Sequence, residues 1–302
     1  MLRVRGDDVV ALVRSPDKAK PLGDIGCELV AGDLGDAAAL RAAMQGADSV
    51  FHVAATYQVG IPASARPSMY ESNVVGTENV LDTAIEEGVG RIVHVSTANV
   101  FGNTRGRVVD ESYERPGNDF LSYYDETKYL AHQLAKERAA RGAPVIIVQP
   151  SMIYGPNDHS QLGAFLAQAM RGKLRYQSFP EMGFSAVHVD DAAHGILLAH
   201  DKGRIGETYV LSGETTTMGE AIAKAARAAG RKPPRLVMPA FLAKMMVPAG
   251  PIVGKLMKLP PNLAEAIKAA EGVTYWASSD KARDELGYSP RSLDDGLRTM
   301  LV

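Results

Sequence analysis

The stretch RIVHVSTANVFG, residues Arg91–Gly102, indicates the class of fold more clearly than any other part of the chain. It begins as an apolar run typical of a strand buried on both faces and ends as a loop of small and polar residues. A helical segment, Tyr124–Arg141, and a second apolar strand, Pro144–Pro156, follow it. A strand, a helix and a strand in this order predict an α/β protein with a parallel sheet.

The same alternation extends outward on both sides. A strand ends at Arg14, a second buried strand covers Ser49–Ala55, and a helix covers Asn73–Glu87. After Pro156 the rhythm breaks into short helices separated by prolines. We therefore predict a doubly wound first domain over residues 1–156 and a smaller, mostly helical lobe over residues 157–302, with the strand at 207–213 returning to the first domain.

Composition excludes several classes of protein. The 302 residues are 46% hydrophobic, carry a formal net charge of −2 and show no basic stripe, so nucleic acid is not an expected partner. Cys27 is the only cysteine, which rules out an intrachain disulfide and fits a reducing compartment. We predict a cytoplasmic protein without a metal site, because no residues show metal-ligand spacing.

The segment Met238–Pro261 is the most apolar stretch near the C-terminus. Lys244 and Lys255 bound an uncharged run of only ten residues, whereas a spanning helix needs about 20. We predict no integral membrane segment. The segment is interpreted as packed helices of the lobe, with a helix lying on a surface or over a substrate as the alternative.

Tyr124 and Lys128 supply the clearest chemical signal. Their i, i+4 spacing puts a phenol and an ammonium on one helix face, where the cation is expected to lower the phenol pKa. Thr97 ends the preceding strand, and QPSMIYGP, Gln149–Pro156, ends the following one. Carboxyl ends of parallel strands face one crevice, so these residues are expected to share a site with a small-molecule substrate.

With these motifs in place, nearly the whole chain resembles the extended short-chain dehydrogenase/reductase family, the NAD-dependent epimerase/dehydratase group, and in particular dihydroflavonol-reductase-like and 3β-hydroxysteroid-dehydrogenase-like members. The resemblance implies a Rossmann-like fold. The segments that carry it are GDLGD (32–36), VFHVAA (50–55), NVVGTENVLDTA (73–84), VSTANVFG (95–102), YDETK (124–128), PSMIYGP (150–156) and VHVDDAA (187–193).

The resemblance also implies roles for single residues. Tyr124 matches the family's acid/base tyrosine, Lys128 the lysine that holds the cofactor ribose, and Thr97 the residue that binds the substrate oxygen. Asn73 matches a helix asparagine that supports the site. The implied cofactor contacts comprise Tyr124 and Lys128 together with Asp33, Leu34, Ala54, Ala55, Pro150, Ser151 and Ile153.

The opening MLRVRGDDVV departs from the family pattern. It predicts the tail of a helix capped by Gly6, followed by a strand, whereas the family begins with a strand and a Gly-x-x-Gly-x-x-Gly turn that this sequence does not contain. We interpret the chain as truncated at the N-terminus by roughly 20 residues, so that the sheet lacks its first strand and its glycine-rich turn. Weak dinucleotide binding is the expected consequence.

Arg14, followed by Ser15, ends the strand where an acidic residue would bind the ribose of NAD. An arginine suits a 2′-phosphate, so NADP is the predicted cofactor and NAD the alternative. We favour a reductase acting on a ketone or aldehyde of a small, apolar substrate. A nucleotide-sugar epimerase or dehydratase and a non-catalytic dinucleotide-fold protein stay open, as does a homodimer.

Overall fold

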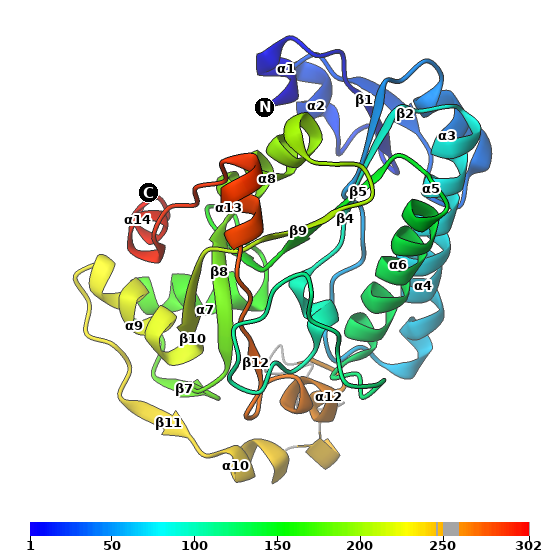
Figure 1. The fold of residues 1–302 in the computed structure, drawn as a ribbon. Helices are drawn as coiled ribbons and strands as arrows, with labels where there is room; N and C mark the ends of the chain where they lie inside the picture. The colour runs from blue at the N-terminus through cyan, green and yellow to red at the C-terminus, as the bar shows by residue number, and fades with distance from the viewer. Residues whose placement is uncertain (246, 250–259, 302) are drawn as a thin grey trace.

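The computed structural model describes residues 1–245, 247–249 and 260–301. Its main sheet is parallel throughout and has the order β3-β4-β5-β9 (Figure 1). These strands are β3 (Ser49–His52), β4 (Arg91–Val95), β5 (Val145–Pro150) and β9 (Thr208–Leu211). Every residue of β5 is buried, as expected of a strand covered by helices on both faces. The predicted α/β class is confirmed.

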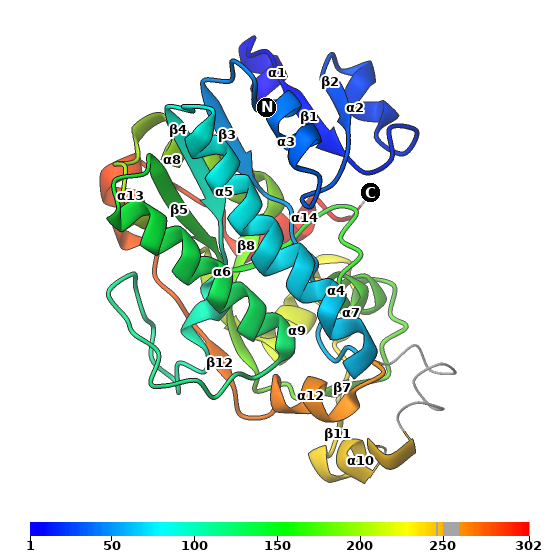
Figure 2. The ribbon, with the colours of Figure 1, turned by 90° about the vertical axis from the view of Figure 1, so that its right-hand side faces the viewer.

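Helices cover both faces of this sheet. Neighbouring residues of β4 point to opposite sides, so Ile92 packs under one helical layer and Val93 under the other. One layer consists of α3 (Ala37–Met44), α5 (Gly76–Glu86) and α6 (Tyr123–Ala140), and the opposite layer of α8 (Val189–Lys202) and α13 (Asp280–Leu286) (Figures 1 and 2). Helix α5 continues from η1 (Ala63–Ala65), α4 (Arg66–Tyr70) and a π-helical turn, η2 (Glu71–Val75).

The N-terminal segment forms a separate parallel pair, β1 (Val10–Val13) with β2 (Glu28–Ala31), joined through α2 (Lys20–Asp24). A short helix, α1 (Leu2–Arg5), precedes it and ends at Gly6 with φ 91°, which confirms the predicted cap. Within the described residues the ladder is interrupted between β1 and β3 (Figure 2). The predicted absence of a strand from the sheet stays a prediction.

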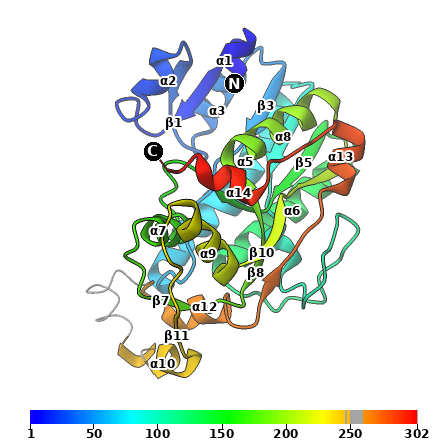
Figure 3. The same cartoon turned by 90° about the vertical axis from the view of Figure 1, so that its left-hand side faces the viewer.

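A second sheet forms the centre of the C-terminal lobe. Strand β8 (Gly183–His188) pairs with β6 (Met152–Tyr154), β10 (Glu214–Thr217) and β12 (Thr274–Tyr275). Its outer cover is α7 (Gln161–Met170), α9 (Met218–Ala228) and α14 (Leu293–Arg298) (Figure 3). The sequence predicts a mostly helical lobe, and helices do supply more of its residues than strands; the centre of the lobe is nevertheless β8, a wholly buried six-residue strand.

The outermost part of the lobe is a parallel pair, β7 (Tyr176–Ser178) with β11 (Leu236–Met238), followed by α10 (Ala240–Met245), η4 (Val247–Ala249) and α12 (Leu263–Lys268). No helix in the described part of the chain is long and apolar enough to cross a membrane. Of the apolar segment at 238–261, residues 246 and 250–259 lie outside the described residues.

Candidate active site

Thr97 and Tyr124 are each placed by the beginning of a helix. Thr97 caps η3 (Ala98–Phe101), accepting a hydrogen bond from the Asn99 amide at 3.2 Å. Ser122 caps α6, and its Oγ accepts from the Asp125 amide at 3.1 Å. Such caps satisfy amides that the helix itself leaves unpaired. They fix the segments that carry Thr97 and Tyr124 at the carboxyl end of the parallel sheet.

The structure brings Tyr124 and Thr97 together. The Thr97 side chain is the partner of the Tyr124 phenol that lowers its pKa. The Tyr124 side chain is only 7% exposed, and the ring of Tyr57 meets it edge-on with 4.8 Å between ring centroids. Burial raises the pKa of the Tyr124 phenol, and the nearby Tyr57 raises it further, while Thr97 acts in the opposite sense.

Lys128 lies one turn further along α6, on the same face. Its Nζ donates to the backbone carbonyl of Val95 at 3.0 Å, and burial lowers its pKa to about 8. The Lys128 ammonium is held by β4. The Tyr124 pKa is raised in this arrangement, whereas a lowered pKa was expected, because the desolvation of the phenol outweighs the opposing effect of Thr97.

Asn73 lies behind this pair in the π-helical turn η2. Its amide accepts from the Thr56 backbone N–H at 2.7 Å and donates to the Thr56 carbonyl and the Thr127 hydroxyl, each at 3.0 Å. It therefore joins the loop after β3 to α6, three residues from Tyr124. These contacts agree with the supporting position expected for Asn73, since they hold the loop after β3 against α6. π-Helical turns such as η2 often occur at functional sites.

A buried ion pair, Arg115–Asp125, joins the two segments that carry Thr97 and Tyr124. Neither residue was singled out from the sequence. The side chains are 6% and 3% exposed, and two N–O distances are 3.0 and 3.3 Å. Arg115 also donates to the Val100 carbonyl in η3 at 3.3 Å. The pair thus connects the helix that carries Tyr124 with the turn that begins at Thr97.

Glu265 of α12 is a second residue that the sequence did not indicate. Its Oε1 accepts from the backbone amides of Gly60 at 3.2 Å and Tyr123 at 3.1 Å. The carboxylate therefore caps the first turn of α6 from the C-terminal lobe and complements the positive end of the helix dipole. It fastens the lobe next to Tyr124.

The remaining predicted cofactor contacts lie after the ends of the strands. Arg14 and Asp33 are exposed beyond β1 and β2, and Ser15 and Leu34 beside them are half-buried. Leu34 packs against the helical layer, and its carbonyl accepts from Asn79 at 2.8 Å. The backbone of Ala54 and Ala55 follows β3 and is exposed. The parallel ladders direct these ends to one edge of each sheet.

Pro150 ends β5, Ser151 follows it, and Ile153 in β6 is 41% exposed. The Ser151 Oγ is buried and has no hydrogen-bond partner among the described residues. A buried hydroxyl without a partner is costly, and a polar ligand at this strand end would satisfy it. Together with the exposed ends at Arg14 and Ala54, this orphaned atom fits an extended polar cofactor.

Several other aromatic, methionine and histidine residues belong to the buried core. Phe184 is 1% exposed and belongs to the core of the lobe, against which Met152 and Met182 also pack, so its side chain does not line a substrate pocket. His52 and His94 are buried strand residues, and burial lowers the pKa of His52 to about 3. Within the described ranges no cluster of potential metal ligands occurs.

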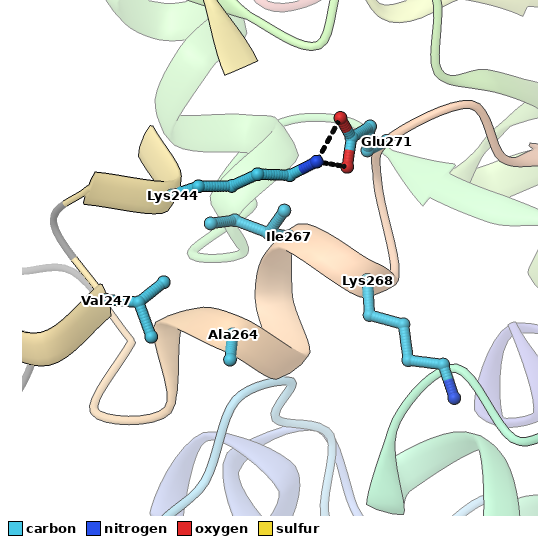
Figure 4. A pocket seen from close by; sticks show the side chains of 6 residues that line it. All are labelled: Lys244, Val247, Ala264, Ile267, Lys268 and Glu271. Carbon is cyan, nitrogen blue, oxygen red and sulfur yellow. Dashed lines mark hydrogen bonds and ion pairs between the residues drawn. The ribbon is translucent and has the colours of Figure 1, made fainter. Parts of the chain in front are cut away.

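An open pocket between α10 and α12 lies apart from these residues. It has a volume of about 340 Å³ and is lined by six residues, Lys244, Val247, Ala264, Ile267, Lys268 and Glu271 (Figure 4). The Lys244 ammonium crosses it to the Glu271 carboxylate at 2.8 Å. None of Thr97, Tyr124 and Lys128 lines it, so it is not the candidate active site.

A doubly wound sheet with a buried Tyr–Lys pair and a Thr at one strand end defines a dinucleotide-dependent oxidoreductase of the short-chain type. The model of the NAD dependent epimerase/dehydratase family matches residues 1–212, and the chain belongs to that family. It is therefore an NAD(P)-dependent oxidoreductase of the extended short-chain dehydrogenase/reductase type.

Individual relatives agree with this placement. The chain is similar to a dihydroflavonol 4-reductase-like protein of Synechocystis sp., with 30% identity over 97% of this chain and 86% of that one. It is 31% identical to 4-hydroxy-2-methyl-3-oxo-4-farnesyl-3,4-dihydroquinoline-1-oxide ketoreductase of Stigmatella aurantiaca, over 96% and 87%. The crystal structure of gox2253 aligns with a TM-score of 0.83 and 30% identity, covering 99% of this chain and 91% of that one.

Proposed function

We propose that the protein reduces a ketone or aldehyde of a small, apolar substrate with a hydride from NADPH. The observation that carries this proposal is the arrangement of three residues at one end of the sheet: Thr97 caps η3 there, Tyr124 begins α6, and Lys128 lies one turn further along α6 and donates to the Val95 carbonyl. Two neighbouring hydroxyls can bind one substrate oxygen together. Relatives whose names describe ketone reduction support this choice over sugar epimerisation.

In this proposal Thr97 donates a hydrogen bond to the carbonyl oxygen and Tyr124 protonates that oxygen as it becomes an alkoxide. A phenol with a raised pKa is fully protonated at neutral pH, which suits a proton donor. Lys128 would hold the cofactor ribose, and Pro150, Ser151 and Ile153 would line the nicotinamide end. The bound cofactor supplies the hydride.

For the adenine end we propose that Arg14 and Ser15 bind the 2′-phosphate of NADP, with Asp33 and Leu34 beside the adenine and Ala54 and Ala55 along the cofactor backbone. The support is that Arg14 is exposed and unconstrained at a strand end, and a guanidinium binds phosphate in a bidentate way. The lobe at 157–302 would supply the substrate contacts.

The test is isotope transfer. NADPH carrying deuterium at the transferred position is incubated with the protein and a panel of apolar ketones and aldehydes. We expect deuterium on the carbinol carbon of a product and a stoichiometric loss of NADPH. Conversion of a nucleotide sugar without net consumption of the cofactor would overturn the proposal and favour the epimerase alternative. Failure of every substrate class, with cofactor bound, would favour a non-catalytic role.

A further inference from the structure

The outer edge of the C-terminal lobe carries a concentrated positive charge although the whole chain has a net charge of −2. We define the cationic rim as the six exposed residues that precede β7 and β11: Arg171, Lys173, Arg175, Arg231, Lys232 and Arg235. The parallel register pairs Tyr176 with Leu236, so the two basic runs approach the same end of the ladder. A Cβ placed on Gly172 would lie 3.6 Å from the Arg231 side chain, which confirms that the runs are neighbours.

These cations lack carboxylate partners within the described parts of the chain. The nearby Lys244 is different, since it pairs with Glu271 at 2.8 Å. Helices α7 and α9 end at Met170 and Ala228, so their negative dipole ends explain a cation in the last turn but not Arg175 or Arg235 further along. Six like charges gathered this closely repel each other unless an anionic surface meets them.

Exposed apolar side chains continue directly from the rim. We define the apolar face as Tyr176 and Leu236, which are paired in the ladder, together with Phe241, Leu242 and Met245. Leu236 is 68%, Phe241 60% and Met245 72% exposed. Figures 1 and 3 show β11 and α10 at the periphery of the molecule, away from the main sheet.

The orientation of α10 is fixed by its other side. Ala243 is buried, and the Lys244–Glu271 ion pair ties the helix to the end of α12. Phe241, Leu242 and Met245 therefore point outward into solvent, although all three side chains are apolar. A helix whose apolar side chains face away from its own protein is typical of an interfacial segment.

We propose that the cationic rim and the apolar face dock together on the surface of an anionic phospholipid bilayer. Phosphate headgroups would meet the arginines and lysines, while Phe241, Leu242 and Met245 enter the boundary between headgroups and acyl chains. A nucleic acid or an acidic protein surface would neutralise the rim but would leave the apolar face in water. This inference does not depend on the proposed reaction.

The test is co-sedimentation of the full chain with phosphatidylcholine vesicles, with and without phosphatidylglycerol. We expect binding only to the anionic vesicles and a steep loss with added salt. The triple variant Arg231→Gln, Lys232→Gln, Arg235→Gln should weaken binding roughly 100-fold, since each surface cation contributes about fivefold. Phe241→Ser with Leu242→Ser should weaken the binding that survives at high salt.

A matched control removes three exposed cations elsewhere: Lys18→Gln, Lys20→Gln, Lys136→Gln. Because all these positions are exposed, every variant is expected to unfold at the wild-type temperature. Failure of the wild type to bind anionic vesicles at low salt would overturn the proposal. An equal loss of vesicle binding in the control triple would also overturn it. So would binding of polyglutamate or DNA that is as tight as vesicle binding and is unchanged by Phe241→Ser.

Discussion

The two parallel ladders of the sheet region differ in how deeply they are buried. Every residue of β5 and the three central residues of β4 are buried, with helices on both faces. In β1 and β2 no residue is buried, and within the described residues neither strand pairs with the main sheet. The buried ladder carries Thr97 and supports Tyr124 and Lys128, whereas the exposed one carries Arg14 and Asp33. If the proposed roles hold, proton transfer depends on the more deeply buried ladder, and cofactor selection depends on the ladder that opens more easily.

The largest effect should come from the catalytic hydroxyl on the buried side. Tyr124→Phe keeps the ring in its pocket and removes the proton donor, so turnover should fall about 10²–10⁴-fold. NADPH affinity and the unfolding temperature should stay close to wild type. Near-normal turnover in steady-state assays would remove Tyr124 from the mechanism.

Next in size is the ion pair that joins the buried catalytic segments. Arg115→Met leaves Asp125 buried without a partner and should lower the free energy of unfolding by about 3–5 kcal/mol. Arg41→Met, which breaks the exposed pair with Glu86, is the matched control and should cost less than about 1 kcal/mol. Denaturant titration of both variants measures the difference.

If Arg115 positions the catalytic residues, its effect should go beyond stability. Under conditions where it remains folded, Arg115→Lys should lower kcat more than it raises KM. Equal destabilisation by the Arg115 and Arg41 substitutions would show that the buried pair has no special role.

The exposed ladder should respond to an added strand. An extension of roughly 20 residues, carrying a strand and a Gly-x-x-Gly-x-x-Gly turn, would offer backbone amides to a pyrophosphate at a helix N-terminus. We expect NADPH to bind at least about 100-fold more tightly to the extended chain, because several charge-assisted hydrogen bonds are gained. Calorimetric titration of both chains compares them. The same affinity in each would show that the existing edge already holds the cofactor.

Arg14 should have a smaller and more selective effect. Arg14→Ala removes one exposed guanidinium and should weaken NADPH about tenfold while leaving NADH nearly unchanged. Competition binding of both cofactors provides the comparison. An equal loss of affinity for NADH and NADPH would mean that Arg14 supports the fold of β1 and does not bind the 2′-phosphate.

The last effect is a gradual pH dependence on the buried side. Burial lowers the Lys128 pKa from 10.5 to about 8, so between these values the unfolded chain binds the proton and the folded chain does not. The contribution of Lys128 to stability is therefore unfavourable below pH 8 and improves as pH rises, by at most about 1.4 kcal/mol per pH unit. Lys128→Met should remove this slope. A wild-type and variant difference that is flat with pH would contradict the assignment.

The sequence predicted the elements whose signals are local. Apolar runs located β3, β4 and β5, and the Tyr124–Lys128 spacing located the pair on one face of α6. It could not reveal Arg115–Asp125 or Glu265, since an ion pair through a loop, and a contact 142 residues apart, leave no periodic pattern. The direction of the Tyr124 pKa shift was missed for a similar reason. Spacing shows which charge is near, but the burial of Tyr124 depends on its packing with Ile61 and Met69.

Hydrogen exchange at single amides tests the contrast between the two ladders most directly. We predict that amides of β4 and β5 exchange only when the whole protein unfolds, and that amides of β1 and β2 exchange at least about 100-fold faster through local opening. Added NADPH should slow exchange in β1 without changing β4. Equal protection of both ladders in the free protein would contradict the division into a rigid catalytic side and a weakly held cofactor side.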